Sequence, residues 1–174
     1  MDGPNHFNRQ GRQLYELELS SFIFERPLLV DIPKGEGELV EPEELLAFDE
    51  DISRADALLI RSGFSALRET DNRTYSERGP AVSSRAAQLI VERYPHLKAV
   101  GLDWISLSSP LHLDDGIRAH QIMLGHTGAG PVLIIEDIDL SGIRPEELEL
   151  VFALPLFVEG IDSAPVTIVA RLRD

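Results

Sequence analysis

The sequence predicts an α/β domain with more strands than helices. Short, densely apolar runs of strand length recur along the chain, and two of them, 57–61 and 132–135, end abruptly at polar residues. Such runs are typical of strands buried on both faces of a sheet. A segment with helical periodicity, 83–94, precedes another apolar run at 98–103. Strand, loop, helix and strand therefore follow one another, as in α/β folds.

The first strands are predicted from apolar runs near the start of the chain. The alternation over 14–19 fits an edge strand loosely. The denser runs 22–24 and 27–32 predict a strand buried on both faces, because polar residues do not alternate with the apolar ones. A turn at 33–37 follows, and the run 57–61 predicts the next buried strand.

Three segments carry helical signals. A proline and acids in its first turn place a helix start in 40–46. Ser83 is a candidate N-cap of a helix that ends before a proline. Asp114 begins a shorter helix that closes near Gly125. The polar segment 65–78 lacks periodicity and is predicted to be a loop.

Within that predicted loop, four side chains face either a site or solvent, and solvent is the commoner case; they are Arg68, Arg73, Tyr75 and Arg78. The remaining strands are predicted at 98–103, 132–135, 147–156 and 166–172.

Composition limits the possible partners. The 174 residues are enough for one domain with its own core. Sixteen basic and thirty acidic residues give a net charge of −14, which argues against nucleic acid and anionic membrane as partners. The chain has no cysteine, which excludes disulfides and thiolate metal sites. We find no signal peptide and no apolar run long enough to span a bilayer, and therefore expect a cytoplasmic protein.

Two residues stand out as candidates for chemistry. Helical spacing places His120 on an apolar helix face, where a hydrogen-bonded core histidine is the commoner interpretation. Glu136 follows a fully apolar strand, at the sheet edge where α/β folds bind ligands. A solvated strand-terminal acid is an equally good interpretation of Glu136.

The opening stretch adds two more candidates. Asp2 and His6 flank a Gly-Pro bend that could hold both side chains on one side. Together with His120 and Glu136 they form a set of oxygen and imidazole donors that suits zinc, manganese or iron. Spacing alone cannot bring these four residues together. Neither a nucleophile elbow nor a phosphate-binding glycine loop is present.

The segment 1–7 resembles the second half of the signature of the cyclase family of metal-dependent hydrolases, which includes bacterial kynurenine formamidase. That signature reads His-x-Gly-Thr-His-x-Asp-x-Pro-x-His-Phe, and the chain offers Met-Asp-Gly-Pro-Asn-His-Phe. The similarity continues along nearly the whole chain, at 22–33, 75–87, 100–106, 119–124 and 134–140.

The resemblance implies one cyclase-like domain over 1–174, with a swivelling β/α/β fold, a mixed β-barrel-like core and outer helices. It implies that Asp2, His120 and Glu136 bind a divalent metal, zinc or manganese, with two ions per site in intact family members. His6 would move protons without binding metal. The implied activity is arylformamidase-like hydrolysis of amide or cyclic-amide bonds in small substrates, by a metal-activated water, in a homodimer or homotetramer.

Two departures from the family pattern affect these expectations. The first half of the signature, with two metal-binding histidines, would lie ahead of Met1, so the chain is expected to be N-terminally truncated relative to the family. Thr167 stands where many members carry arginine. Three interpretations are open: a longer, active natural protein, which is preferred; one metal held through Asp2, His120 and Glu136; or a metal-free relic. The competing function is therefore a non-catalytic binding or assembly protein.

Overall fold

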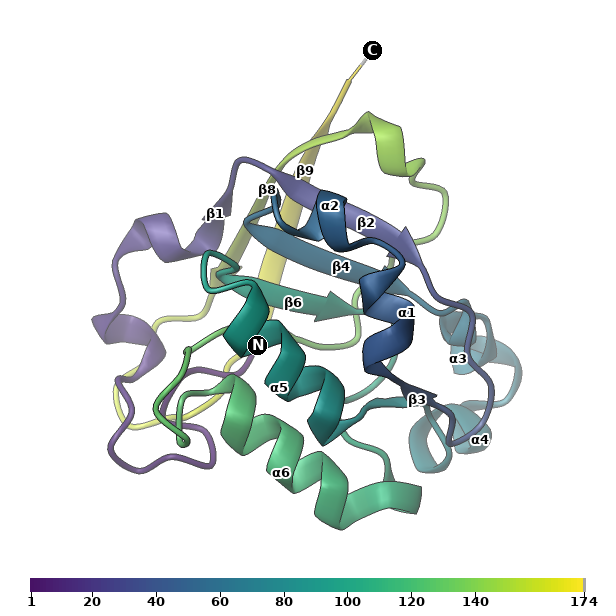
Figure 1. The fold of residues 1–174 in the computed structure, drawn as a ribbon, viewed down its shortest axis with the longest axis horizontal. Coiled ribbons are helices and arrows are strands. Elements are labelled where there is room, and N and C mark those ends of the chain that lie inside the picture. Colours follow the sequence, from purple (N-terminus) through teal and green to yellow (C-terminus); the bar gives the residue numbers. More distant parts are fainter. Residues whose placement is uncertain (174) are drawn as a thin grey trace.

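The computed structural model describes residues 1–173. Its central sheet has four parallel strands, in the order β2 (Pro27–Asp31), β4 (Ala57–Arg61), β6 (Ala99–Leu102) and β7 (Leu133–Ile135). Figure 1 shows β2, β4 and β6 side by side. An antiparallel sheet contains β1 (Ile23–Phe24), β8 (Leu148–Pro155) and β9 (Val166–Leu172). A third, two-stranded sheet pairs β3 (Leu39–Val40) with β5 (Ala81–Val82).

Six α-helices connect these strands: α1 (Pro42–Leu46), α2 (Asp49–Ile52), α3 (Leu67–Thr70), α4 (Asn72–Glu77), α5 (Ser84–Arg93) and α6 (Leu113–Met123). With nine strands and six α-helices in the described part of the chain, the predicted α/β class and the excess of strands are confirmed. Within residues 1–173, no helix is long and apolar enough to cross a bilayer.

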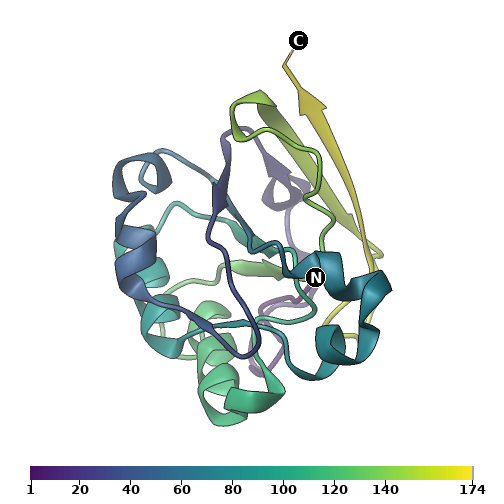
Figure 2. The same ribbon diagram turned by 90° about the vertical axis from the view of Figure 1, so that its right-hand side faces the viewer.

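The central sheet is the middle of three layers, because its strands are apolar on both faces. Successive side chains of a strand point to opposite faces. Leu58 of β4 accordingly joins one core cluster, with Ile90 of α5 and Met123 of α6. Its neighbour Leu59 joins the other, with Val151 of β8. Figure 2 shows the blue helices α1 and α2 and the green helix α6 on one side of the central strands and the yellow strand β9 on the other.

Several local predictions are confirmed, and the structure contains the helix caps and apolar strands on which they were based. The side chain of Ser83 accepts a hydrogen bond from the amide of Ala86 at 3.1 Å, which caps α5 as predicted. Helix α1 starts at Pro42, and a glutamate capping box closes its first turn. The runs at 57–61 and 132–135 form β4 and β7, the latter slightly shorter than predicted.

Two predictions are wrong. The segment 14–19 forms no strand: it contains the 3₁₀ turn Leu14–Glu16 and the first residue of a second turn, Leu19–Phe22. There the Glu16 side chain accepts a hydrogen bond from the amide of Gln13 at 2.7 Å, and such local bonding competes with strand formation. The segment 65–78, predicted as a loop, contains helices α3 and α4, each too short to show helical periodicity.

A buried aspartate joins the ends of two central strands. Asp103 follows β6 and is fully buried. Its carboxylate accepts hydrogen bonds from the amides of Ser62 (2.8 Å) and Gly63 (2.9 Å), just after β4. The hydroxyls of Ser62 (2.6 Å) and Ser65 (3.2 Å) also donate to it. This carboxylate therefore satisfies donors that would otherwise lack partners in the interior.

Replacing Asp103 with alanine is expected to lower the free energy of unfolding by about 3 kcal/mol, because it leaves buried donors unpaired. Urea denaturation would measure the change. Glu18→Ala, at an exposed carboxylate, is the control and should stay within about 0.5 kcal/mol of the unmodified chain. An Asp103→Ala midpoint equal to that of the control would show that these bonds do not hold the sheet end together.

Candidate metal centre

Asp2 lies in an extended segment that pairs with β7. Its amide donates to the carbonyl of Ile134 at 2.8 Å, and on its other side it bridges Ser163. The amino group of Met1 donates to the carbonyl of Ala164 at 2.9 Å. This two-sided pairing buries the Asp2 side chain and fixes it beside the carboxyl end of the central sheet.

His6 reaches the same place through a tight bend. Its amide donates to the carbonyl of Gly3 at 2.9 Å. Its Nε2 lies 3.9 Å from Oδ2 of Asp2, and its Nδ1 lies 3.2 Å from Oδ2 of Asp162. The Phe7 ring centroid lies 4.5 Å from that of His6, so an aromatic ring flanks this imidazole.

His120 approaches from helix α6 and is almost completely buried. Its Nδ1 lies 2.8 Å from the carbonyl oxygen of Gly116, four residues earlier in the helix. Because a carbonyl can only accept, Nδ1 carries the proton, and in the neutral ring Nε2 keeps a free lone pair. This nitrogen lies 3.8 Å from Oδ2 of Asp2 and 3.5 Å from Oε1 of Glu136.

Glu136 follows β7 directly, and its carboxylate faces His120. Its Oε1 accepts a hydrogen bond from the amide of Leu107 at 2.7 Å. Burial alone would raise the pKa of Glu136, but the adjacent His120 ring and the hydrogen bond from the Leu107 amide bring it below the usual value. For His120, burial opposes protonation, whereas Glu136 and the Gly116 carbonyl favour it and raise the pKa overall.

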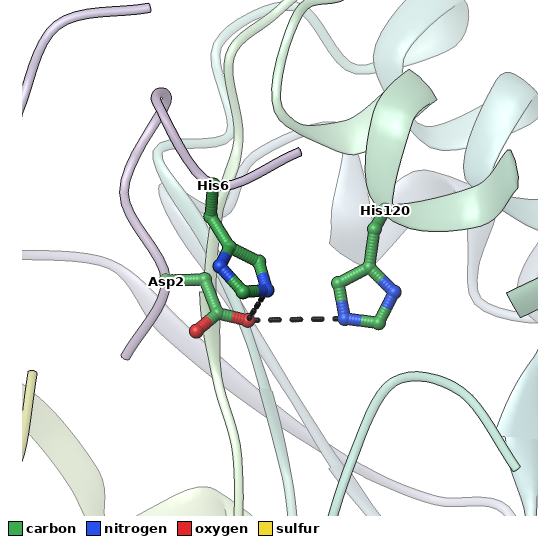
Figure 3. Close-up of side chains that lie close together, drawn as sticks. All are labelled: Asp2, His6 and His120. Carbon is green, nitrogen blue, oxygen red and sulfur yellow. Dashed lines mark ion pairs between the residues drawn. The ribbon is translucent and has the colours of Figure 1, made fainter. Parts of the chain in front are cut away.

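The fold therefore gathers all four candidate residues, which the sequence could not place together. Ligand atoms of Asp2, His6 and His120 all lie within 4.8 Å of one another. Figure 3 shows both imidazoles directed at the same oxygen of Asp2. Glu136 joins this group through its contact with His120. One segment, one helix and one strand end thus contribute donors to a single cluster.

The state of Asp2 tests whether this cluster suits a cation. Its Oδ2 is buried and has no hydrogen-bond partner, although two imidazole nitrogens face it. Burial, followed by repulsion from Glu136, raises the pKa of Asp2 to about 6. A buried, unpaired carboxylate oxygen is costly unless it binds a cation or a donor. The donor set therefore fits a divalent metal, with imidazole and carboxylate ligands of the kind that zinc and manganese accept.

Sequence reasoning missed several residues around the cluster. Asp162 sits in a loop that carries no sequence signal. The Phe7 ring, whose centroid lies 5.1 Å from that of His120, belongs to the signature segment but was not singled out. The amide of Leu107 cannot be recognised from a side chain at all. The other three histidines of the chain, His96, His112 and His126, are all exposed and lie outside the cluster.

Comparisons with known proteins indicate a family for this chain. The family model described as "Putative cyclase" matches residues 1–109. An uncharacterized protein of Haemophilus influenzae is 28% identical over 102 residues, which are 59% of this chain and 72% of that protein. The segment matched by the family model includes Asp2 and His6, whereas His120 and Glu136 lie beyond it. The place of these last two residues in the cluster therefore rests on the geometry.

Proposed function

Because the chain belongs to the cyclase family, we propose that it is a metal-dependent hydrolase of amide or cyclic-amide bonds in small substrates, similar to an arylformamidase. The observation that supports this most directly is the buried Oδ2 of Asp2, which has no hydrogen-bond partner and faces the Nε2 atoms of two histidines. An anionic oxygen in this setting is suited to binding a cation and is poorly satisfied without one.

We assign the metal ligands to Asp2, His120 and Glu136, with zinc or manganese as the ion. A bound metal supplies Lewis acidity, which polarises a scissile carbonyl and acidifies water. The ring of His120 is oriented for ligation because its Nδ1–H donates to Gly116. The amide of Leu107 fixes one oxygen of Glu136 in the same way.

His6 is the proposed proton carrier. Its side chain is 24% exposed, whereas that of His120 is 4% exposed, so His6 has better access to substrate and solvent. The Asp162 carboxylate beside Nδ1 supports one orientation of the ring and leaves Nε2 facing the cluster. An imidazole so placed can accept a proton from water and deliver it to the leaving amine.

Removal of metal is expected to abolish hydrolysis reversibly. Purified chain would be treated with a chelator, dialysed, and assayed on N-formylkynurenine and on simple cyclic imides. Zinc or manganese should restore activity, and magnesium should restore less, because it prefers an all-oxygen octahedral site. Full turnover in the chelated, dialysed protein would contradict metal dependence.

The surface of the antiparallel sheet supports the proposal of a homodimer or homotetramer. Strand β9 is an edge strand, and large apolar side chains are exposed on it and on β8, including Val169 (57%) and Leu154 (42%). An apolar edge strand is a template for pairing with a second copy. Light scattering would measure the mass. Assembly without metal binding would favour the alternative, a binding or assembly protein without catalysis.

A further inference from the structure

The residue after Glu136 has an unusual backbone conformation. Asp137 has a φ of 61°, in the left-handed region that L side chains rarely adopt. Within residues 1–173, the other non-glycine residue with positive φ is Phe7, at 55°, directly after His6. Both therefore follow a residue of the cluster. Unfavourable backbone angles concentrate at functional sites, where the surroundings hold them in place.

The left-handed residue belongs to a bulge at the end of β7. The register of β6 and β7 would direct the amide of Asp137 to the carbonyl of Leu102. The amide of Ile138 occupies that position instead, at 2.9 Å, and Asp137 donates to the carbonyl of Trp104, also at 2.9 Å. One extra residue is thus accommodated where the ladder ends. Bulges of this kind redirect side chains, here that of Glu136.

Two side chains donate hydrogen bonds to Asp137. The hydroxyl of Tyr75 and the guanidinium of Arg68 both donate to Oδ1 of Asp137. Arg68 also donates to the backbone carbonyl of Asp137, at 3.2 Å. Burial, followed by the hydrogen bond to Asp137, raises the pKa of Tyr75 to about 12, so its hydroxyl stays protonated as a donor. Tyr75 is itself stacked on Phe64, with ring centroids 6.0 Å apart.

We propose that Arg68 and Tyr75 are positioning residues for the metal centre: by holding Asp137 in its left-handed conformation, they fix the Glu136 carboxylate beside His120. This inference rests on the proposed function, because it assigns Glu136 as a ligand. The Glu136 carboxylate has two close contacts of its own. Its Oε1 lies 2.7 Å from the amide nitrogen of Leu107 and 3.5 Å from Nε2 of His120. A change in the backbone angles of Asp137 would move the Glu136 carboxylate away from both Leu107 and His120.

Substitutions at Asp137 separate its conformation from its contacts. Asp137→Ala removes the contacts and disfavours positive φ, so we expect affinity for manganese or zinc to fall about 10- to 100-fold. Asp137→Gly also removes the contacts, but glycine adopts positive φ freely, so the affinity for metal should fall less than in Asp137→Ala. Asp137→Asn can keep both and should bind metal almost as the unmodified chain does. Tyr75→Phe removes one donor and should fall between the Ala and Asn variants.

Isothermal titration would measure affinity, and thermal denaturation without metal would check folding. Asp139→Ala, at an exposed aspartate in the same loop, is the matched control and should bind normally. Crystal structures of the metal-free variants should show Glu136 leaving the Leu107 amide in Asp137→Ala. If Glu136→Gln weakens binding and Asp137→Ala does not, the positioning role is wrong and the proposed function stands. If the unmodified chain binds no metal, both are wrong.

Discussion

Replacing His120 with alanine is expected to reduce the affinity of the chain for zinc or manganese by more than about 100-fold. Residues that only support a ligand cost up to about 100-fold when removed, and His120 is proposed as a ligand itself. The Nε2 atom of His120 faces both Asp2 and Glu136. The alanine variant therefore lacks the nitrogen ligand that lies beside these two carboxylates. Titration calorimetry with each metal would measure the affinity.

The control for this experiment is His126→Ala, at an exposed histidine three residues beyond the end of α6, the helix that carries His120. It should leave affinity unchanged. Because His120 is buried, circular dichroism must show that the variant folds, and His120→Gln offers a less disruptive change of volume. If His120→Ala and His120→Gln both fold and bind metal as tightly as the unmodified chain, His120 is not a ligand.

Replacing His6 with alanine is expected to lower turnover at least about 100-fold while the metal content stays the same. General acid–base catalysis typically contributes about this much or more, and His6 is the more exposed of the two imidazoles in the cluster. Metal content and turnover would be measured on the same preparation. Asn5→Ala, in the same bend, is a control for local distortion.

The two possible roles of His6 give opposite results in this experiment. Its Nε2 lies as close to Asp2 as that of His120 does, at 3.9 Å and 3.8 Å. The cluster of Asp2, His6 and His120 is therefore also compatible with ligation by His6. A His6→Ala chain that loses its metal would show that His6 is a ligand and would end its assignment as a separate proton carrier.

The sequence predicts those parts of the fold in which local signals and tertiary structure agree. Strand β4 is an apolar run with no polar interruption, and α5 has both a serine cap and an apolar face. The helices within 65–78 escaped prediction because they are held by tertiary contacts, such as that of Tyr75 with Asp137. Short helices carry too few turns for periodicity to reveal them.

Much of the candidate site could be named from the sequence but could not be assembled from it. The chemistry of Asp2, His6, His120 and Glu136 suits a metal, yet their proximity depends on the pairing of Asp2 with Ile134 across more than a hundred residues. The resemblance to a family implied that these residues belong to one site, whereas their spacing in the sequence did not. Arg68 was left open between site and solvent, because its partner lies in the bulge after β7, which has no sequence signal.

The proposed binding of a divalent metal by Asp2, His120 and Glu136 is tested most directly by metal analysis of the purified 174-residue chain. The chain would be dialysed against zinc or manganese, freed of unbound ions, and measured by mass spectrometry beside Asp2→Ala. A site of this kind predicts stoichiometric metal in the unmodified chain and its loss in the variant. No retained zinc or manganese in the folded, unmodified chain would contradict it.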